Sequence, residues 1–530
     1  MTVKKKINNI VIVGGGNTGW LVAATLIDRI PINANTKITL VESPDIPLIG
    51  VGESTTAQMR KLVRNAYFLG NEEEFLKETG STYKYGIVHS DWKTIGKKFY
   101  SPIGGDFYNE TRFPNENYDY MRIYHIANNL PYDYVYQSQC MANNKIFYIN
   151  GEPNNYYKDF IGESGYSFLN TTDVAYHLDS YKVNEYIRRK CLETKRISRI
   201  EATIKEVVRD SEGYVQSLRL DNDQELSGDL FFDCTGFSRV LKLEENKFNS
   251  YGDTLLLDTA IIFPEQNEDF GKTEVETYTH AKAMKYGWMF EIPLQERTGK
   301  GYNFSSKYTT PEQAKIEVEK MYGREIDVKK VIKYDPGSVD IFWDRNVISS
   351  GIASGFFEPL EATTIHASLK QVEHFIEVYY HNDLDIRGNQ AIKNQYNKEM
   401  KYFYQDLRDF IHFHYQNTRQ DTDFWVDASS KDKLSDKLKN NFEMWKTRMP
   451  RVDDYSEGKM NNALGLGNAL WLQVGMGMDL FDSNLAKKEL EYYNLYNIAK
   501  NQLKNIKDFS GYCIPKSMGA SEYYTMIKEK

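Results

Sequence analysis

The chain has 530 residues, of which 41% are hydrophobic and 26% are charged. A chain of this size and composition can bury a large core without disulfides or structural metals, so disorder is excluded as its main state. Its 66 basic and 74 acidic residues give a formal net charge of −8, which argues against a dedicated nucleic-acid binder. The four cysteines show no CxxC pairing, so neither a disulfide scaffold nor a structural zinc site is expected.

The N-terminus and the hydropathy pattern indicate a cytoplasmic protein. The apolar run that follows the basic first residues, Ile10–Val13, has only four residues, which is too short for the core of a signal peptide. No stretch of the sequence approaches the ~20 apolar residues of a membrane span. We therefore expect neither export nor membrane insertion.

The first 42 residues predict a βαβ unit. Ile10–Val13 is a continuous apolar run, as in a strand buried on both faces, and the glycine-rich run Gly14–Gly19 follows it directly. An apolar stripe at helical spacing comes next, and then a second strand, Ile38–Val41. The order of strand, glycines, helix and strand is that of a dinucleotide-binding domain.

Each glycine of this run has a physical role in dinucleotide binding. Gly14 permits the sharp turn, Gly16 lets the backbone approach a pyrophosphate, and Gly19 lets helix and strand pack closely. Thr18 lies in the same turn, and Glu42 ends the second strand, where a carboxylate can accept hydrogen bonds from ribose hydroxyls. The alternative is a glycine-rich turn with a purely structural role.

A second dinucleotide site is missing from the sequence. The other GxG-like run, Gly465-Leu466-Gly467, has a leucine at position 470 in place of the third glycine, and no strand precedes it. One site without a second indicates a flavoprotein that does not bind NAD in a Rossmann domain of its own.

The loop Gly-Val-Gly-Glu-Ser-Thr-Thr at residues 50–56 has two compatible interpretations. Thr55–Gln58 fits a capping box for a following helix that we expect to run to about Leu69. The glycines also free backbone N–H groups to face a flavin ring. The candidate cofactor-binding residues of the loop are Gly52, Glu53, Ser54 and Thr55.

A third motif runs from Ser354 to Ile365 and contains Glu-Pro-Leu-Glu. Pro359 fits the first position of a helix, which would place residues 361–364 in its first turn, where free N–H groups attract anions. A small anion could bind there beside a flavin. The alternative is a well-capped helix in which Glu361 serves the helix dipole.

Single titratable residues have weaker signals. Lys84 stands between two tyrosines, where it is either a surface lysine extended over aromatic neighbours or a desolvated amine suited to catalysis. His412 and His414 are two residues apart on an expected helix, so they point to different faces and we predict no metal site.

Along the rest of the chain, we predict that segments of the nucleotide-binding domain alternate with segments of a substrate region. The middle third is turn-rich and aromatic and suggests antiparallel strands, whereas residues 392–411 carry the apolar stripe of a long helix. The predicted parts are a nucleotide-binding βαβ part (1–90), a substrate region (91–170), the continuation of the first domain (171–245), a substrate β region (246–335), the end of the first domain (336–390) and a helical C-terminal region (391–530).

Together these motifs resemble the flavin-dependent halogenases of the tryptophan halogenase type. The resemblance implies an α/β (α+β) fold with an FAD-binding Rossmann-like domain of the flavin monooxygenase type. The abundance of asparagine, lysine and tyrosine would also suit a homologue from a marine phage. The matching segments are residues 14–20, the 50–56 loop, Thr82-Tyr83-Lys84, residues 175–179, residues 233–237, Trp288-x-Phe290-x-Ile292-Pro293, the Glu-Pro-Leu-Glu helix start, and residues 414–425.

The resemblance implies a specific mechanism. FADH2 from a separate flavin reductase reacts with O2, and a halide (chloride, bromide or iodide) bound near Thr363 and Thr364 becomes hypohalous acid. This species travels through an internal passage to Lys84, which holds it by hydrogen bonding or as a haloamine, while Glu361 polarises it or takes the ring proton. Ile365 would lie beside the flavin.

Three departures from the family pattern affect the expected site. Phe290 replaces the second tryptophan of the WxWxIP signature, which is thought to keep the flavin from acting as a simple monooxygenase. Ala362 replaces the usual serine and Thr364 the usual glycine at the halide site.

Several alternatives therefore stay open. An FAD-dependent aromatic monooxygenase would share the flavin motifs and accept NADPH directly, and a non-catalytic flavoprotein would give no halide-dependent product. The expected substrate is an aromatic small molecule resembling tryptophan, indole or a phenol. Both a monomer and a homo-oligomer are compatible with the sequence.

Overall fold

A computed structural model describes residues 7–48, 50, 52–103, 119–149, 152–153, 174–267, 274–381, 384–451, 454 and 468–530. The chain forms two compact units, each built from three segments. The first unit comprises residues 1–80, 178–251 and 335–405, and the second comprises residues 81–177, 252–334 and 406–530. Within the described ranges, no helix is both long enough and apolar enough to cross a bilayer.

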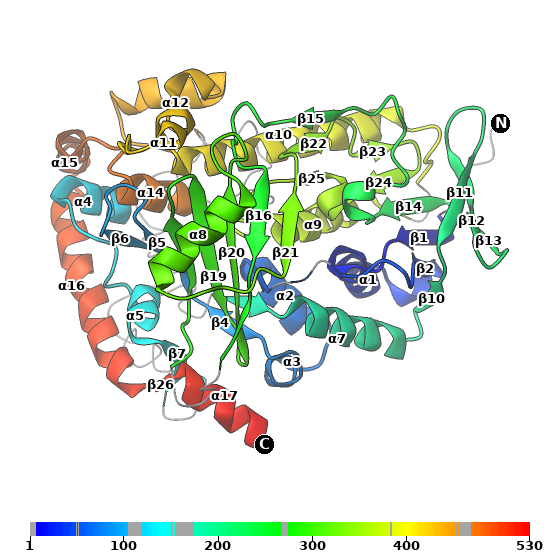
Figure 1. Cartoon of the computed structure of the whole chain (residues 1–530), viewed down its shortest axis with the longest axis horizontal. Helices are drawn as coiled ribbons and strands as arrows, with labels where there is room; N and C mark the ends of the chain where they lie inside the picture. Colours follow the sequence, from blue (N-terminus) through cyan, green and yellow to red (C-terminus); the bar gives the residue numbers. More distant parts are fainter. Residues whose placement is uncertain are drawn as a thin grey trace. The chain divides into compact units, whose positions relative to one another are not determined.

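A six-stranded sheet forms the centre of the first unit (Figure 1). The strands pair in parallel except at one edge, where β23 and β24 are antiparallel. Ile10 and Ile12 are fully buried, as the sequence predicted for a strand covered on both faces. In sheet order the strands are β10 (Ile197–Glu201), β2 (Lys37–Glu42), β1 (Asn9–Val13), β14 (Leu230–Asp233), β24 (Val347–Ser349) and β23 (Trp343–Asp344).

Helices pack around this sheet, and α1 contacts both α7 and α9. Local capping explains several helix ends; α3, for example, begins after Asn71, whose side chain accepts a hydrogen bond from the Glu74 N–H, and ends at Gly80 in a left-handed conformation. The helices are α1 (Asn17–Arg29), α2 (Ala57–Asn65), α3 (Glu72–Thr79), α7 (Ser180–Glu193), α9 (Thr363–His374) with a π-helical turn (Phe375–Tyr379), and α10 (Gln390–His414), with 3-10 turns at Ile32–Ala34, Gly236–Ser238 and Gly351–Ala353.

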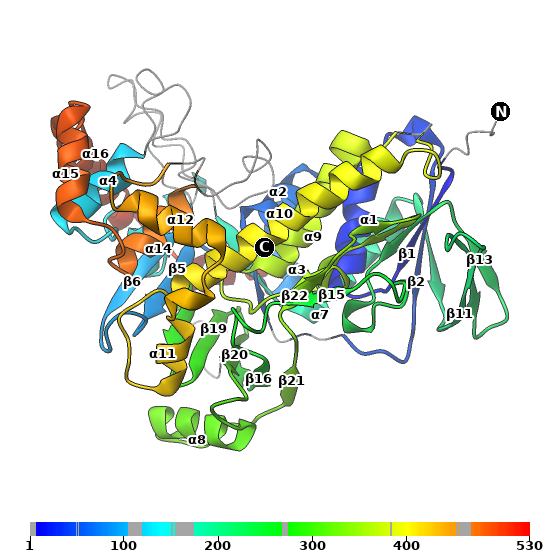
Figure 2. The same ribbon diagram turned by 90° about the horizontal axis from the view of Figure 1, so that it is seen from above.

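Two small antiparallel sheets complete the first unit. The sheet of β11 (Ile204–Arg209), β12 (Val215–Leu220) and β13 (Glu225–Ser227) is visible near β1 and β2 in Figure 2. Its buried residues share one hydrophobic cluster with β1 and β2. The other sheet orders its strands β15 (Phe248–Ser250), β22 (Gly337–Val339) and β25 (Gly355–Phe356).

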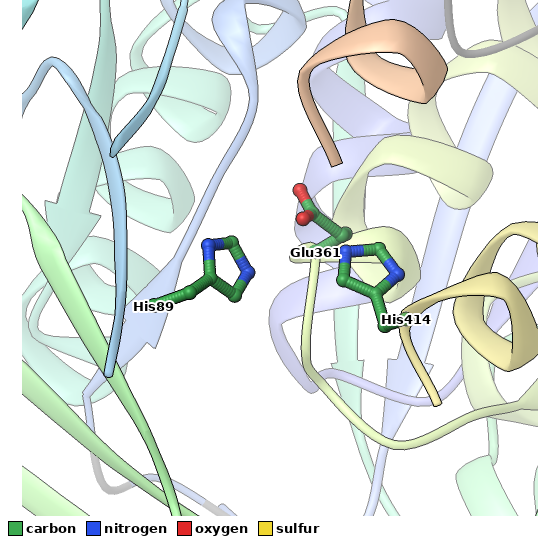
Figure 3. A group of neighbouring side chains, drawn as sticks. All are labelled: His89, Glu361 and His414. Carbon is green, nitrogen blue, oxygen red and sulfur yellow. The ribbon is translucent and has the colours of Figure 1, made fainter. Parts of the chain in front are cut away.

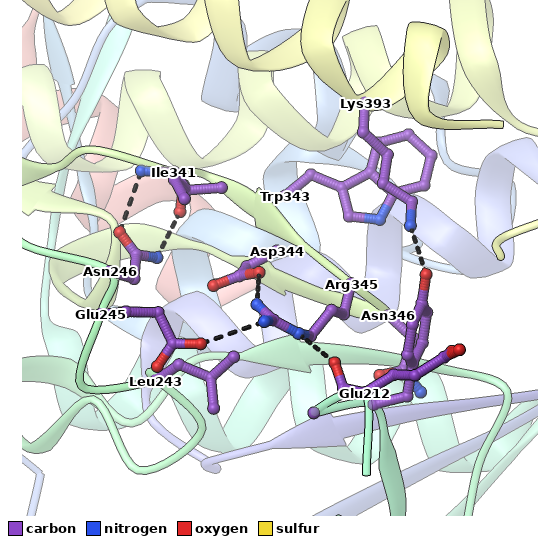
Figure 4. Close-up of polar contacts among 12 residues, drawn as sticks. Glu212, Leu243, Glu245, Asn246, Ile341, Trp343, Asp344, Arg345, Asn346 and Lys393 are labelled. Carbon is purple, nitrogen blue, oxygen red and sulfur yellow. Dashed lines mark hydrogen bonds and ion pairs between the residues drawn. The ribbon is translucent and has the colours of Figure 1, made fainter. Parts of the chain in front are cut away.

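A polar network holds the turn between β23 and β24 (Figure 4). Arg345 occupies the turn with a φ of 54°, and its guanidinium binds the backbone carbonyl of Glu212, the Asp344 carboxylate and the Glu245 carboxylate at 2.6, 2.6 and 3.0 Å. Lys393 of α10 donates a hydrogen bond to the Tyr214 hydroxyl at 3.1 Å. The network therefore connects segments that are distant in the sequence.

A mostly antiparallel sheet forms the centre of the second unit, with β18 and β5 as its parallel pair. Helix α8 (Pro311–Tyr322) lies against β16 and shares a hydrophobic cluster with it. In sheet order the strands are β21 (Lys330–Lys333), β16 (Thr259–Ile262), β20 (Arg297–Phe304), β19 (Gly287–Pro293), β18 (Thr279–Ala283), β5 (Gly86–Ser90) and β6 (Lys98–Pro102), with β17 (Glu265–Gln266) paired to β20.

The rest of the second unit is mainly helical. Strands β4 (Thr82–Lys84) and β9 (Ala175–Leu178) pair with each other, and β26 (Ser517–Gly519), β7 (Lys145–Ile149) and β8 (Glu152–Pro153) form a small sheet. The helices are α4 (Tyr120–Asn128), α5 (Tyr136–Asn143), α11 (Asp423–Ala428), α12 (Asp436–Trp445), α14 (Asn468–Gly477), α15 (Ser483–Tyr492), α16 (Tyr496–Cys513) and α17 (Ala520–Glu529), with 3-10 turns at Lys431–Lys433 and Ile514–Lys516.

Local details of the sequence interpretation need correction. The cap of α2 is Thr56, whose hydroxyl accepts from the Gln58 N–H at 3.4 Å, so the capping box expected at Thr55 is wrong. This helix also ends at Asn65, before the expected Leu69. The long helix predicted from the 392–411 stripe is confirmed as α10. The run at residues 465–467 lies outside the described residues.

Candidate active site

The glycine turn between β1 and α1 has one open side. Gly14 has a φ of +105°, and a Cβ there would lie 2.5 Å from the Cys234 carbonyl oxygen. A Cβ on Gly19 would lie 1.9 Å from the Gly14 carbonyl oxygen. At Gly16, by contrast, the nearest protein atom to a Cβ would be Leu48 Cδ2 at 3.9 Å. Packing thus requires glycine at positions 14 and 19, whereas Gly16 borders free space.

The N-terminus of α1 can bind an anion in the space beside Gly16. Gly16 is the N-cap and brings no side-chain cap, so the first backbone N–H groups of the helix and its positive dipole end face outward. The Oδ1 atom of Asn17, the first residue of α1, is buried without a hydrogen-bond partner among the described residues. A glycine-lined cradle with free N–H donors fits the pyrophosphate of FAD.

Glu42 lies beside the same turn at the end of β2. Its carboxylate covers Gly15 so closely that a Cβ there would lie 1.4 Å from Glu42 Oε2. Arg199 of the neighbouring strand β10 forms an ion pair with Glu42, and Asn184 of α7 donates a hydrogen bond to the Gly15 carbonyl at 3.0 Å. The ion pair with Arg199 orients the carboxylate expected to bind the ribose, and the Asn184 hydrogen bond holds the glycine turn beside it.

The 50–56 loop is held against α1 and α7. Glu53, which begins the short strand β3 (Glu53–Ser54), accepts hydrogen bonds from Asn17 Nδ2 and Ser180 Oγ, both at 2.8 Å. Burial raises the pKa of the Glu53 carboxyl above its usual value. Gly52 has a φ of +106°, which favours glycine, and Thr55 is fully buried.

The start of α9 differs from the sequence prediction. The helix begins at Thr363, and the segment around Pro359 is a turn in which the Ala362 N–H donates to the Pro359 carbonyl at 3.2 Å. Pro359 is therefore not the first helical residue, and Glu361 precedes the helix instead of lying in its first turn. Ala362 is the N-cap, with a φ of 57° and no side-chain cap. The first N–H groups of α9 thus lack a side-chain acceptor at the cap.

The residues at this helix start are nearly all buried. Thr363 is 0% exposed, and its Oγ1 has no hydrogen-bond partner in the part of the chain that the structure describes. Glu361 and Ile365 are also buried, whereas Thr364 is half-buried. The Thr56 hydroxyl meets His366 Nδ1 of the same helix at 3.0 Å. The first unit therefore brings the predicted flavin loop and the predicted halide helix into direct contact.

Lys84 lies in the interior of the second unit. It is 2% exposed and pairs with Ala175 across β4 and β9, so the surface-lysine interpretation is wrong. Burial first, and the Lys84 charge in addition, keep the pKa of His177 well below its usual value. His177 meets the hydroxyls of Thr82 and Thr279, each at 3.0 Å.

The charge of Lys84 also affects the pKa of a second imidazole, that of His89 in β5. Burial, His414, His280 and Lys84 together keep the pKa of His89 far below its usual value. The His89 ring stacks on Phe99 with centroids 4.6 Å apart, and the His414 ring lies 5.5 Å away (Figure 3). Lys84 therefore has two neutral imidazoles and an aromatic cluster in its surroundings.

The WxFxIP segment occupies β19 of the same unit. Trp288 is 1% exposed and Phe290 5% exposed, and Ile292 and Pro293 are buried as well. The Thr82 hydroxyl donates to the Pro293 carbonyl at 2.6 Å, which links the strand of Lys84 to this segment.

His412 and His414 have separate partners. His414 Nδ1 meets the Phe410 carbonyl at 2.8 Å, whereas His412 Nε2 lies 3.5 Å from the Gln416 amide.

Comparison with known proteins decides the family. The sequence model of the tryptophan halogenase family matches residues 9–487. The chain belongs to the tryptophan halogenase family. It is 31% identical over 506 residues to tryptophan 7-halogenase RebH of Lentzea aerocolonigenes, covering 89% of this chain and 90% of that protein. It is 30% identical to tryptophan 6-halogenase SttH of Streptomyces toxytricini, covering 91% of this chain and 93% of that one.

Solved structures of flavin-dependent halogenases share the fold of this family member. Tar14, a tryptophan C-6 flavin-dependent halogenase from taromycin biosynthesis, superimposes with a TM-score of 0.84 at 25% identity, over 99% of this chain and 100% of Tar14. BrvH from Brevundimonas sp. BAL3 gives a TM-score of 0.80 at 26% identity, over 98% and 99%. The predictions of an FAD-binding Rossmann-like fold and of a flavin-dependent halogenase, an oxidoreductase, are confirmed.

Several partners of the predicted site residues were not predicted from the sequence. Arg199, Asn184 and Ser180 bind Glu42, Gly15 and Glu53, and the Lys84 charge acts on His89 and His177. Apart from His177, none of them lies in a segment that the sequence singled out, because each meets its partner through packing of distant segments. The closest signal was the matching segment 175–179, which contains His177 and ends just before Ser180.

Proposed function

We propose that this enzyme makes hypohalous acid with FADH2, O2 and a halide, and uses Lys84 to halogenate an aromatic substrate. The observation that carries the proposal is the burial of Lys84, with 2% exposure, beside two imidazoles of lowered pKa. Burying an ammonium costs free energy that its hydrogen-bond or charge partners must offset, and buried lysines commonly serve in catalysis. Lys84 is thus the site of halogen delivery.

The cofactor is held by residues of the first unit. The turn of Gly14, Gly16, Thr18 and Gly19 takes the pyrophosphate, and Glu42 takes the ribose. The loop residues Gly52, Glu53, Ser54 and Thr55, together with Ile365, border the flavin. Bound reduced FAD supplies, with O2, the two-electron oxidant that converts the halide to hypohalous acid.

The halide binds at the start of α9. The uncapped N–H groups of Thr363 and Thr364 and the positive end of the helix dipole attract an anion. The buried Thr363 hydroxyl, which makes no hydrogen bond within the described residues, adds a donor. These donors hold the halide while it is oxidised.

Lys84 and Glu361 carry out the substitution. The Lys84 ammonium donates a hydrogen bond to the oxygen of hypohalous acid, or holds the halogen as an N–X haloamine, and thereby presents an electrophilic halogen. With hydrogen-bonded hypohalous acid, a ring carbon attacks the halogen, the bond from halogen to oxygen breaks, and the leaving oxygen takes the proton that Lys84 donates and departs as water. In the haloamine alternative, the neutral Lys84 amine first attacks the halogen of hypohalous acid and water leaves, and the ring carbon then attacks the halogen while the N–X bond breaks and its electron pair returns to nitrogen. The ring proton passes to the Glu361 carboxylate, acting as a general base.

The substrate we propose is tryptophan or a related indole or phenol. Relatives that cover most of this chain are named as tryptophan 6- and 7-halogenases. The aromatic cluster around His89, Phe99 and His414 in the unit of Lys84 would suit a flat ring. Trp288 and Phe290, both buried, take the flavin-screening role that the family resemblance implies for this segment.

The electron source is a separate flavin reductase, which delivers FADH2 by diffusion. The sequence contains one dinucleotide motif, used for FAD. NADH alone should therefore give negligible turnover, and an added reductase should restore it.

Mass spectrometry of a panel of aromatic substrates tests the proposed function. The purified protein is incubated with FAD, a flavin reductase, NADH and one halide at a time. A product heavier by one halogen minus one hydrogen, dependent on halide and reductase, is the expected result. Hydroxylated product, formed with NADPH and without a reductase, would instead identify an aromatic monooxygenase, the outcome to which Phe290 in place of tryptophan points.

A further inference from the structure

The Glu53 carboxyl has an uneven set of partners. Asn17 Nδ2 and Ser180 Oγ both donate to the same oxygen, Oε1, at 2.8 Å. The other oxygen, Oε2, makes no hydrogen bond or ion pair within the described ranges, and the Glu53 side chain keeps some exposure. One oxygen thus accepts both donors, and the second has no partner within the described ranges.

The side chains that bind the Glu53 carboxyl are uncharged. Asn17 of α1 and Ser180 of α7 are the side chains that act on this carboxyl, and no lysine, arginine or histidine of the described chain forms an ion pair with it. Burial outweighs the two hydrogen bonds and raises its pKa. The fold therefore disfavours the ionised form of Glu53.

Asn17 connects Glu53 to the proposed phosphate site. It is the first residue of α1, so its backbone N–H is one of the free donors at the helix start, while its side chain binds Glu53. A pyrophosphate at this helix start would therefore lie near the Glu53 carboxyl. Two anions in a partly desolvated place repel each other, whereas a neutral carboxyl does not.

We propose, resting on the FAD site of the proposed function, that FAD binds the form of the enzyme in which Glu53 is protonated. One proton is taken up from solvent with the cofactor when Glu53 is ionised in the free enzyme. The proton resides on Oε2, because both donors occupy Oε1, and Glu53 then turns a hydrogen-bond donor toward the cofactor.

The proposal fixes the sign of the pH dependence. At low pH the free enzyme already carries the proton, so the affinity for FAD does not change with pH. Above the pKa of Glu53 in the free enzyme, binding must recruit a proton, and the affinity falls by up to about tenfold per pH unit. The affinity levels off again once the pH exceeds the pKa of Glu53 in the complex.

FAD binding to the apoprotein tests this directly. Oxidised FAD is titrated between pH 5.5 and 8.5 by flavin fluorescence, and calorimetry in phosphate and in Tris measures proton uptake. We expect weaker binding as the pH rises, with uptake of up to one proton per FAD. An affinity independent of pH, with no proton uptake, would overturn the proposal.

Two glutamate-to-glutamine variants distinguish a specific role of Glu53 from the general effect of removing one carboxylate. Glu53→Gln mimics the neutral acid, so its affinity should be constant across this range and at least as high as that of the wild type at pH 8.5. Glu185→Gln, the same change at an exposed position of α7, should keep the wild-type pH dependence. A wild-type pH dependence in a folded Glu53→Gln variant would contradict the assignment.

The measurement is independent of halogenation. It uses neither halide nor substrate, so an enzyme that fails to halogenate can still show proton-linked FAD binding. Conversely, an enzyme that halogenates but binds FAD without proton uptake would refute only the role of Glu53. Should Glu53→Gln fold poorly, the calorimetric proton count of the wild-type protein decides alone.

Discussion

The two units of this halogenase prepare their sites in opposite ways. In the first unit, the cofactor region is built from backbone N–H groups, glycines and helix starts, at Gly16 of α1 and Ala362 of α9. In the second unit, Lys84 is a buried amine whose charge acts on the side chains of His89 and His177, and the His89 ring stacks on Phe99. Backbone sites depend on local sequence, whereas side-chain sites depend on which distant segments pack together.

This difference has a chemical reason. An anionic cofactor and a halide are bound by partial positive charge. The backbone N–H groups at helix N-termini provide this charge and do not ionise. Delivering an electrophilic halogen to one ring carbon calls for a positioned donor and a shaped apolar surface.

A large effect on the rate of halogenation is expected at the proposed general base. Glu361→Gln should lower the rate of halogenation by ~10²–10⁴-fold, because an amide cannot accept the ring proton. The rate is measured by product formation with saturating reductase. Glu377→Gln, at an exposed position in the π-helical turn that follows α9, is the matched control and should be nearly unaffected; an equal loss in both variants would argue against a catalytic role.

Two variants of the glycine turn should change different properties, one the affinity for FAD and the other the stability of the fold. Gly16→Val should weaken FAD binding by about 5- to 150-fold, corresponding to ~1–3 kcal/mol for an inserted side chain, and should leave the apoprotein folded because the position borders free space. Gly19→Ala should lower the melting temperature, because its Cβ would overlap the Gly14 carbonyl. Wild-type FAD affinity in folded Gly16→Val would remove the pyrophosphate assignment.

The features that the sequence could reveal are again the local ones, whereas those that depend on the packing of distant segments could not be predicted. The strand at residues 10–13, the second strand ending at Glu42 and the long helix α10 were predictable, because periodicity and glycine spacing are local. The start of α9 was misplaced, because Pro359 is equally compatible with a turn before a helix. The partners His89 and His177 could not be predicted, since burial and β-pairing bring them near Lys84.

A smaller effect is expected at Arg199, which the sequence did not single out. Its ion pair with Glu42 is partly exposed, and such pairs are worth ~0.2–1 kcal/mol. Arg199→Met should therefore weaken FAD binding by about 1.4- to fivefold, as measured by fluorescence titration. Because its contribution is Coulombic, the difference from the wild type should shrink in high salt; a difference that persists unchanged would indicate a packing role.

The smallest effect concerns the choice of halide. Ala362 provides a methyl group where the family usually has a serine, so the site is less able to replace the hydration shell of chloride. We predict that bromide or iodide is used at least as well as chloride, as measured by competition at equal halide concentrations. Thr364, in place of the usual glycine, opposes this trend by narrowing the site or adding a donor. Clear chloride preference would show that Ala362 does not tune the site in this way.

The central claim, that halide oxidation proceeds without Lys84 whereas halogen delivery requires it, is tested most directly by Lys84→Ala. Flavin reoxidation is followed by absorbance, and halogenated product by mass spectrometry, in the same reaction. Reoxidation by O2 should continue at the wild-type rate while product disappears, and a soluble trap should collect the released hypohalous acid. Lys98→Ala, an exposed lysine on β6, should retain both steps. Near-normal product formation by Lys84→Ala would contradict the account.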